Sequence, residues 1–120
     1  MAENESLGFV ETIGLVTAIE TADAMVKAAR VRVKTVANAD AGLISVICTG
    51  DLAACMAAVD AGKAAAMRVG QVVSTNLIPR PDDDTETLVA SGIGSIMKAK
   101  PASRPPAEDK APAKGDKGRK

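Results

Sequence analysis

The sequence predicts an α+β fold, and two observations carry this prediction. Four β-rich segments and two amphipathic helical segments follow one another in the order β-α-β-β-α-β, and a chain of 120 residues is long enough for one modest core. This order is the ferredoxin-like split βαβ arrangement, so we expect a four-stranded antiparallel sheet with both helices on one face and a short helix near the C-terminal end.

The strongest helix signal lies at residues 51–70. Asp51 can cap the first turn, and Gly70 stands where a left-handed C-cap belongs. Alanine fills many of the remaining positions, so an element packed on this helix can approach closely. The apolar residues that recur at helical spacing are Leu52, Cys55, Met56, Val59, Ala66 and Val69.

The N-terminal part predicts a strand over 7–13, a break at Gly14 and a helix over 15–29. Lys27 and Arg30 lie in the last turn of this helix, where positive charge complements the helix dipole. The apolar face expected to be buried consists of Leu15, Ile19, Ala22, Met25 and Val26.

The middle of the chain predicts a hairpin. Residues 31–36 alternate cleanly, whereas residues 43–48 are almost continuously apolar, so the second strand of the hairpin is expected to be the more central one. Residues 38–42 form the turn. A fourth strand over 71–78 ends at a Pro-Arg-Pro element, after which an aspartate from 82–84 can cap a short helix that extends through Leu88 and Val89.

Two helices cannot cover both faces and both edges of such a sheet, so self-association is expected, and a formal net charge of zero permits it. From about residue 97 the composition changes to Lys, Pro, Ala, Gly and acidic residues. This composition cannot bury a core, and we expect residues 97–120 to form a disordered tail behind a domain over residues 6–96.

Composition also excludes several functions. The balanced charge argues against a general nucleic-acid binder, and the absence of histidine removes His-based triads and His-ligated metal sites. Phe9 is the only aromatic residue, so stacking platforms are missing. We interpret Cys48 and Cys55 as small buried apolar residues in a reducing compartment. Without a long apolar run or an apolar leader, a cytoplasmic protein without membrane contact is expected.

Four short motifs stand in register with this element order: 22–30 (ADAMVKAAR), 50–55 (GDLAAC), 60–62 (DAG) and 78–81 (IPRP). Together they closely resemble the hexamer-forming shell proteins of bacterial microcompartments, and the match extends from about residue 7 to residue 92. The resemblance implies a homohexameric disc that tiles edge to edge into the shell. Its partners would be other hexamers, other shell proteins and encapsulated enzymes, and small metabolites would cross a central pore.

The resemblance also assigns roles to individual residues. Lys27 lies where the family has a disc-edge lysine beside its counterpart on a neighbouring hexamer, and Arg80 matches an arginine that reaches across the same edge. An arginine fork can hold backbone carbonyls, and lysine stems contribute apolar contact. Arg30 occupies a position where relatives often carry asparagine or arginine, so a role at the edge is inferred for it too.

The loop that lines the pore in this family corresponds to Ala39, Asp40, Ala41 and Gly42. Many relatives have Gly-Ser-Gly or Gly-Gly-Gly at the last three positions, from which this chain departs. Six copies of Asp40 would form a ring of carboxylates that favours cations or neutral polar solutes over anions. Alternatively, Asp40 hydrogen-bonds its own turn backbone. No cluster ligand falls in the loop, so neither a metal nor another cofactor is expected.

Two other classes of function compete with the non-enzymatic shell protein. One is a small ferredoxin-like regulatory module that binds a metabolite at a subunit interface, although no phosphate-binding loop of recognised spacing is present. The other is an enzyme that uses Asp82, Asp83, Asp84 and Glu86, but helix capping and solubility explain these charges.

Overall fold

The computed structural model describes residues 5–96, and the predicted disordered tail lies outside these residues. The elements are β1 (Ser6–Ile13), α1 (Leu15–Ala28), β2 (Arg32–Asn38), β3 (Leu43–Gly50), α2 (Leu52–Val69), β4 (Gln71–Ile78) and α3 (Asp83–Thr87), which continues into a π-helical turn over Leu88–Gly92.

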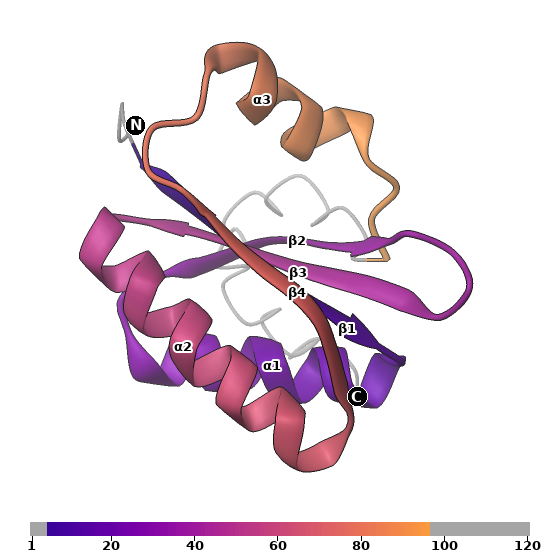
Figure 1. Cartoon of the computed structure of the whole chain (residues 1–120). Helices are drawn as coiled ribbons and strands as arrows, with labels where there is room; N and C mark the ends of the chain where they lie inside the picture. Colours follow the sequence, from indigo (N-terminus) through magenta and orange to yellow (C-terminus); the bar gives the residue numbers. More distant parts are fainter. Residues whose placement is uncertain (1–4, 97–120) are drawn as a thin grey trace, which may run out of the picture.

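One sheet with strand order β2-β3-β1-β4 forms the centre of the molecule, and its neighbouring strands are all antiparallel (Figure 1). This arrangement confirms the predicted α+β ferredoxin-like fold. It also confirms that the second strand of the hairpin, β3, is interior, whereas the alternating strand β2 lies at an edge.

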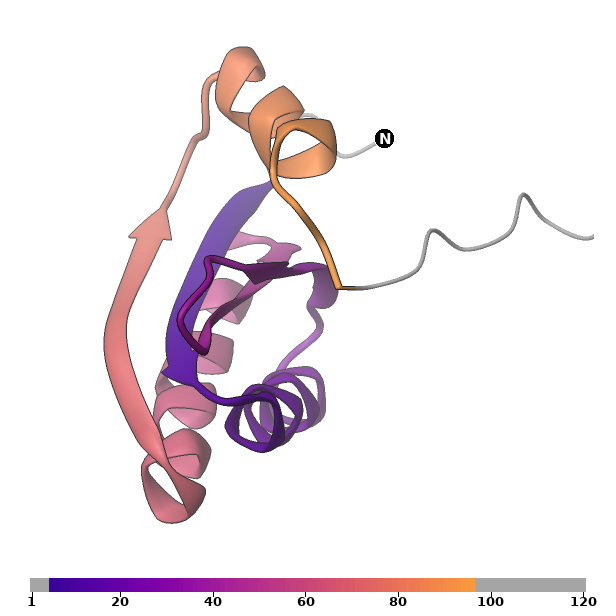
Figure 2. The ribbon, with the colours of Figure 1, turned by 90° about the vertical axis from the view of Figure 1, so that its right-hand side faces the viewer.

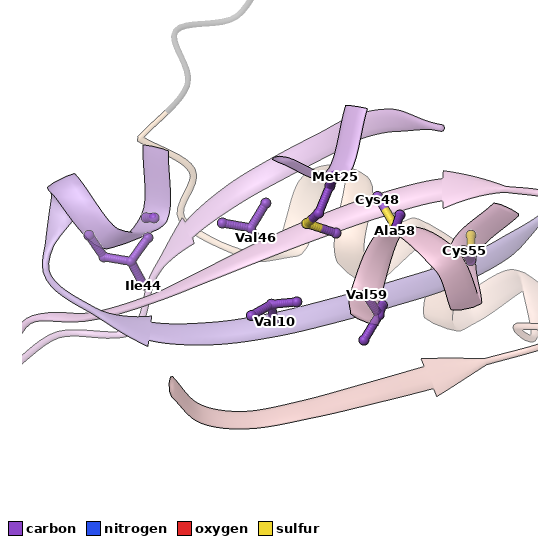
Figure 3. Packing of buried hydrophobic residues seen from close by; sticks show 9 residues of the cluster. Val10, Met25, Ile44, Val46, Cys48, Cys55, Ala58 and Val59 are labelled. Atoms are coloured by element: carbon purple, nitrogen blue, oxygen red, sulfur yellow. The ribbon is translucent and has the colours of Figure 1, made fainter. Parts of the chain in front are cut away.

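The two long helices cover the same face of the sheet, as Figure 2 shows from the side. The main core lies between them and the strands, and it includes Val10, Met25, Val46, Cys48 and Ala58 (Figure 3). On the opposite face, Leu7, Ile47 and Val89 form a smaller cluster. The chain that follows β4 therefore covers part of the second face.

Capping of α2 agrees with the sequence at its start and differs at its end. The Asp51 Oδ1 atom accepts a hydrogen bond of 2.8 Å from the Ala54 N–H, as predicted for an N-cap. Gly70 is not left-handed, because its φ of −168° is extended. The glycine is required for space instead, since a Cβ atom at Gly70 would collide with the Thr17 Oγ1 atom of α1.

The predicted apolar faces of both helices were partly wrong. In α1, Leu15, Ile19 and Val26 are exposed, and the buried residues are Thr17, Ala18, Thr21 and Met25. In α2, Leu52, Met56 and Val69 are exposed, and the buried residues are Cys55, Ala58, Val59, Gly62, Ala65 and Ala66. The helices pack through small and β-branched side chains because their backbones lie close together, and larger apolar residues are left outside.

The close approach of the helices is clearest at Gly62. A Cβ atom there would lie 2.7 Å from the Cγ atom of the fully buried Met25 and 3.2 Å from the Cγ2 atom of Thr21. This confirms that the alanine-rich helix admits a close neighbour. That neighbour is α1 as well as the sheet.

The chain after the π-helical turn returns to the outer edge of β2, which the sequence did not predict. The Asn38 N–H donates to the Gly94 carbonyl at 3.1 Å, and the Ile96 N–H donates to the Val36 carbonyl at 2.9 Å. These bonds cover part of the β2 edge. Within residues 5–96, the outer edge of β4 has no such cover.

Candidate assembly edge and pore loop

The loop between β2 and β3 contains the four residues that the sequence assigned to a pore. The Leu43 N–H donates to the Asp40 carbonyl at 3.0 Å, and the Ala39 N–H donates to the Leu43 carbonyl at 2.9 Å, so the hairpin closes tightly. The Gly14 N–H donates to the Gly42 carbonyl at 2.8 Å. This last bond holds the loop against the junction of β1 and α1.

Three successive loop residues adopt the left-handed conformation, with φ values of 68° at Asp40, 54° at Ala41 and 81° at Gly42. Glycine adopts it freely and aspartate tolerates it, but alanine there costs about 1–2 kcal/mol. The departure from a glycine-rich loop therefore has an energetic cost at Ala41. All four loop residues, 39–42, are exposed.

The carboxylate of Asp40 has no hydrogen bond or ion pair with any residue among 5–96. The turn is instead satisfied by Asn38, whose Oδ1 atom accepts from the Asp40 N–H at 2.9 Å. The alternative in which the Asp40 side chain hydrogen-bonds its own turn backbone is therefore wrong. The carboxylate remains available to another molecule.

The residues assigned to the disc edge lie at the other end of the sheet. A Cβ atom at Gly50 would lie 3.1 Å from the Arg30 carbonyl oxygen, and Gly50 pairs with Ser6 in the antiparallel ladder. The Ser6 Oγ–H in turn donates to the Pro79 carbonyl at 2.7 Å. The chain of contacts thus brings Arg30 and Arg80 to the same end of the molecule.

Lys27 lies in the last turn of α1 and forms an ion pair with Asp23, with 2.7 Å between the lysine Nζ and aspartate Oδ2 atoms. The hydrogen bond to Asp23 and the charge of its carboxylate raise the pKa of Lys27 above its ordinary value. The lysine side chain is 75% exposed. It therefore remains a charged group on the surface, held by one carboxylate.

A second ion pair lies at this end of the sheet, and the sequence did not predict it. The Arg32 Nη2 atom donates to the Glu5 Oε2 atom at 2.9 Å, and the Thr49 Oγ1–H donates to the same oxygen at 3.1 Å. Arg32 pairs with Thr49 across β2 and β3. Only the register of three strands reveals this contact, because Glu5 and Arg32 are far apart in sequence.

Arg30 and Arg80 differ from these paired cations. Both are exposed, and neither has an ion pair or side-chain hydrogen bond within the described part of the chain. Their guanidinium donors are therefore free to bind acceptors on another molecule.

The two candidate sites are separated by the length of the sheet. The ladder between β1 and β3 runs from Ser6 and Gly50 at one end to Ile13 and Leu43 at the other. Eight residues of strand extend for about 25 Å. One end of the protomer thus holds Arg30 and Arg80, and the other holds the turn with the free Asp40 carboxylate together with the exposed Arg68 at the end of α2.

One residue of the enzyme alternative, Asp82, has a structural role. The Asp82 Oδ2 atom accepts from the Asp84 N–H at 3.0 Å and caps α3. Among residues 5–96, no three Cys, Asp or Glu side chains are grouped so that they could hold a metal ion. No helix in that range is long and apolar enough to span a membrane.

The cysteines are both buried and free, as predicted for small apolar core residues. Burial raises the pKa of the Cys48 thiol and raises the pKa of the Cys55 thiol to about 12. A raised pKa disfavours the thiolate form at neutral pH.

Within residues 5–96, this fold is a small α+β domain with unpaired arginines at one end and an exposed turn at the other. The chain belongs to the BMC domain family, whose model matches residues 6–81. This finding confirms the resemblance inferred from the four motifs.

Two relatives named as bacterial microcompartment shell proteins agree with the family. The chain is 52% identical over 89 residues to the bacterial microcompartment shell protein EutM of Escherichia coli K12, which covers 74% of this chain and 92% of the relative. It is 50% identical over 91 residues to the shell protein PduA of Citrobacter freundii, which covers 76% of this chain and 98% of the relative.

A solved structure described as a microcompartment protein from Desulfitobacterium hafniense DCB matches with a TM-score of 0.65 and 30% identity. The match covers 79% of this chain and 51% of that chain, so this chain spans about half the length of the solved protein. The family is one of structural shell proteins, and the predicted class and its location in a bacterial microcompartment shell are confirmed.

Proposed function

We propose that the protein is a non-enzymatic shell tile: a cyclic homohexamer whose outer edges join other tiles and whose central opening passes small polar metabolites. The observation that carries this proposal is the separation of the two sites by the length of the sheet. Arg30 and Arg80 at one end suit contacts between rings, while Asp40 at the other end suits a position near the ring axis.

Exposed apolar side chains support the ring. Val16 and Ile19 on α1 are 75% and 60% exposed, and Met67 on α2 is 62% exposed. Met67 also lines a hollow of about 460 Å³ between α2 and the start of β4. The neighbouring residues Val16 and Ile19, and Met67 beside the hollow, offer apolar surface that favours contact with further protein.

The two apolar surfaces lie on different parts of the protomer. Helix α1 packs over the β2 and β3 side of the sheet, whereas α2 packs over β1 and β4. A contact that joins the α1 surface of one protomer to the α2 and β4 surface of the next is heterologous, and a heterologous contact closes into a ring when the rotation permits. This geometry favours a cyclic assembly in preference to a two-fold symmetric dimer.

The ring would multiply the charge of each loop. Six free Asp40 carboxylates around one axis give a negative field, which admits cations and neutral polar solutes more readily than anions. The exposed Gly42 lets backbone N–H groups face the passage, since no side chain narrows it.

The proposal is tested by negative-stain electron microscopy with light scattering on a refractive-index signal, because the chain contains no Trp or Tyr. The wild type should give hexamers and extended hexagonal sheets. Lys27→Asp and Arg80→Ala should leave the hexamers intact and abolish the sheets. Arg68→Ala, which removes an exposed arginine from the last turn of α2, serves as the matched control and should keep them.

Sheets that persist in both edge variants would refute the assignment of the edge. A stable wild-type monomer or dimer without a lattice over a range of salt concentrations would refute the tile altogether. That result would favour the ferredoxin-like metabolite-binding module.

A further inference from the structure

The ion pair on α1 bears on how an edge lysine can face a copy of itself. Asp23 and Lys27 are four residues apart on one helix, and their charged atoms lie 2.7 Å apart. The aspartate side chain is 49% exposed, so both groups lie on the surface. The pair therefore forms without help from the core.

An edge contact between identical tiles about a two-fold axis brings each residue near its own counterpart. Two Lys27 ammonium groups placed side by side would repel each other, and the free cations Arg30 and Arg80 at the same end would add to that repulsion. Only a carboxylate close to the lysine can offset this charge within each tile.

We propose that Asp23 is a positioning residue of the tile edge, an inference that rests on the proposed tiling function. Its carboxylate neutralises Lys27 within its own protomer and holds the ammonium group along α1. The lysine stem is then presented to the neighbouring tile with less repulsion and in one orientation.

The other nearby acid does not have this geometry. Glu20 also acts on Lys27 through its charge, but more weakly than Asp23, and it makes no ion pair with the lysine within 4.0 Å. Among the other described carboxylates at this end, Glu5 is engaged by Arg32 and Thr49, Asp51 caps α2, and none besides Asp23 and Glu20 acts on Lys27 through its charge. Asp23 is thus the carboxylate that can act on the edge lysine.

The experiment measures the critical protein concentration for sheet formation by light scattering and electron microscopy at low and high salt. Asp23→Asn should raise this concentration at least tenfold at low salt, and salt of about 0.5 M should largely restore assembly, because it screens charges beyond a few ångströms. Asp23→Glu should rescue in part. Glu20→Gln, which removes a more weakly acting carboxylate from the same helix, is the control and should shift the concentration far less than Asp23→Asn.

The double variant Asp23→Asn with Lys27→Met separates positioning by charge from a merely structural role. It removes both charges and keeps an unbranched apolar stem, so it should form sheets at low salt where Asp23→Asn does not. Circular dichroism should show the same helix content in all variants, because an exposed pair at this spacing contributes little to stability.

Several results would overturn the inference. The role of Asp23 is refuted if Asp23→Asn assembles at the wild-type concentration. It is also refuted if neither high salt nor the added Lys27→Met substitution restores assembly. If Lys27→Asp and Arg80→Ala lose their sheets while Asp23→Asn keeps them, this inference fails and the proposed tile stands. If none of the edge variants affects the sheets, the edge assignment fails as well.

Discussion

The contact between α1 and α2 at Gly62 allows a quantitative test of how α1 is held against α2. Gly62→Val places three carbon atoms where even one Cβ atom would lie 2.7 Å from the Met25 Cγ atom. Overpacking of a full core costs about 1–3 kcal/mol, and the better helix propensity of valine returns a few tenths of that. We expect a net loss of about 1–3 kcal/mol.

The assay is denaturant unfolding followed by circular dichroism at one protein concentration, because association affects apparent stability. Ala64→Val, at an exposed position of the same helix, is the matched control and should lose only about 0.5 kcal/mol. Met25→Ala alone should cost about 2–5 kcal/mol, since its side chain is fully buried.

The double variant is decisive, because Met25→Ala makes room for the valine. The combined loss should be smaller than the sum of the single losses by about 1 kcal/mol or more. Additive losses, or a Gly62→Val protein as stable as the wild type, would show that the two helices are not packed through this contact. The orientation of α1 and of Lys27 would then need another explanation.

Two further predictions concern the loop at residues 39–42, which we propose lines the pore, and the buried thiols. Asp40→Lys should leave the hexamer intact and increase the flux of a small anion through reconstituted shells, since it reverses the charge of the loop. Asp40→Asn should give an intermediate flux. Unchanged anion flux in both variants would place Asp40 away from the opening. Folding raises the pKa of the Cys55 thiol to about 12. The protonated thiol therefore contributes its full share to the free energy of unfolding below the pKa of the unfolded chain, and this share is lost as the pH rises from about 9 towards 12. Cys55→Ala should flatten this alkaline decline in a pH series of unfolding curves, and an unchanged slope would contradict the assignment.

Local sequence determined the elements and their order. The hairpin at 38–42 follows from a polar turn between two β-rich segments, and the start of α2 follows from Asp51, whose side chain caps the adjacent turn. These features depend on residues a few positions apart, so they can be inferred before the fold is known. The four family motifs likewise predicted the BMC domain.

Local sequence did not determine which face of each helix is buried. Counting apolar residues placed Leu15, Ile19 and Val26 inside, yet α1 buries Thr17 and Thr21. The closeness of the two helix backbones decides this face, and no pattern within one helix contains that distance. An exposed apolar face on a single protomer also has the pattern of a core face, because an assembly surface excludes water too.

Contacts between distant segments were decided by the tertiary structure alone. The sequence placed Asp40, Lys27 and Arg80 in separate elements, but the register of the sheet puts the loop at one end and Arg30 and Arg80 at the other. The same register joins Glu5 to Arg32 and brings Gly94 to Asn38. The sequence by itself determined the elements and the family, whereas strand pairing over long sequence separations decided where the charges meet, because such pairing depends on the whole fold.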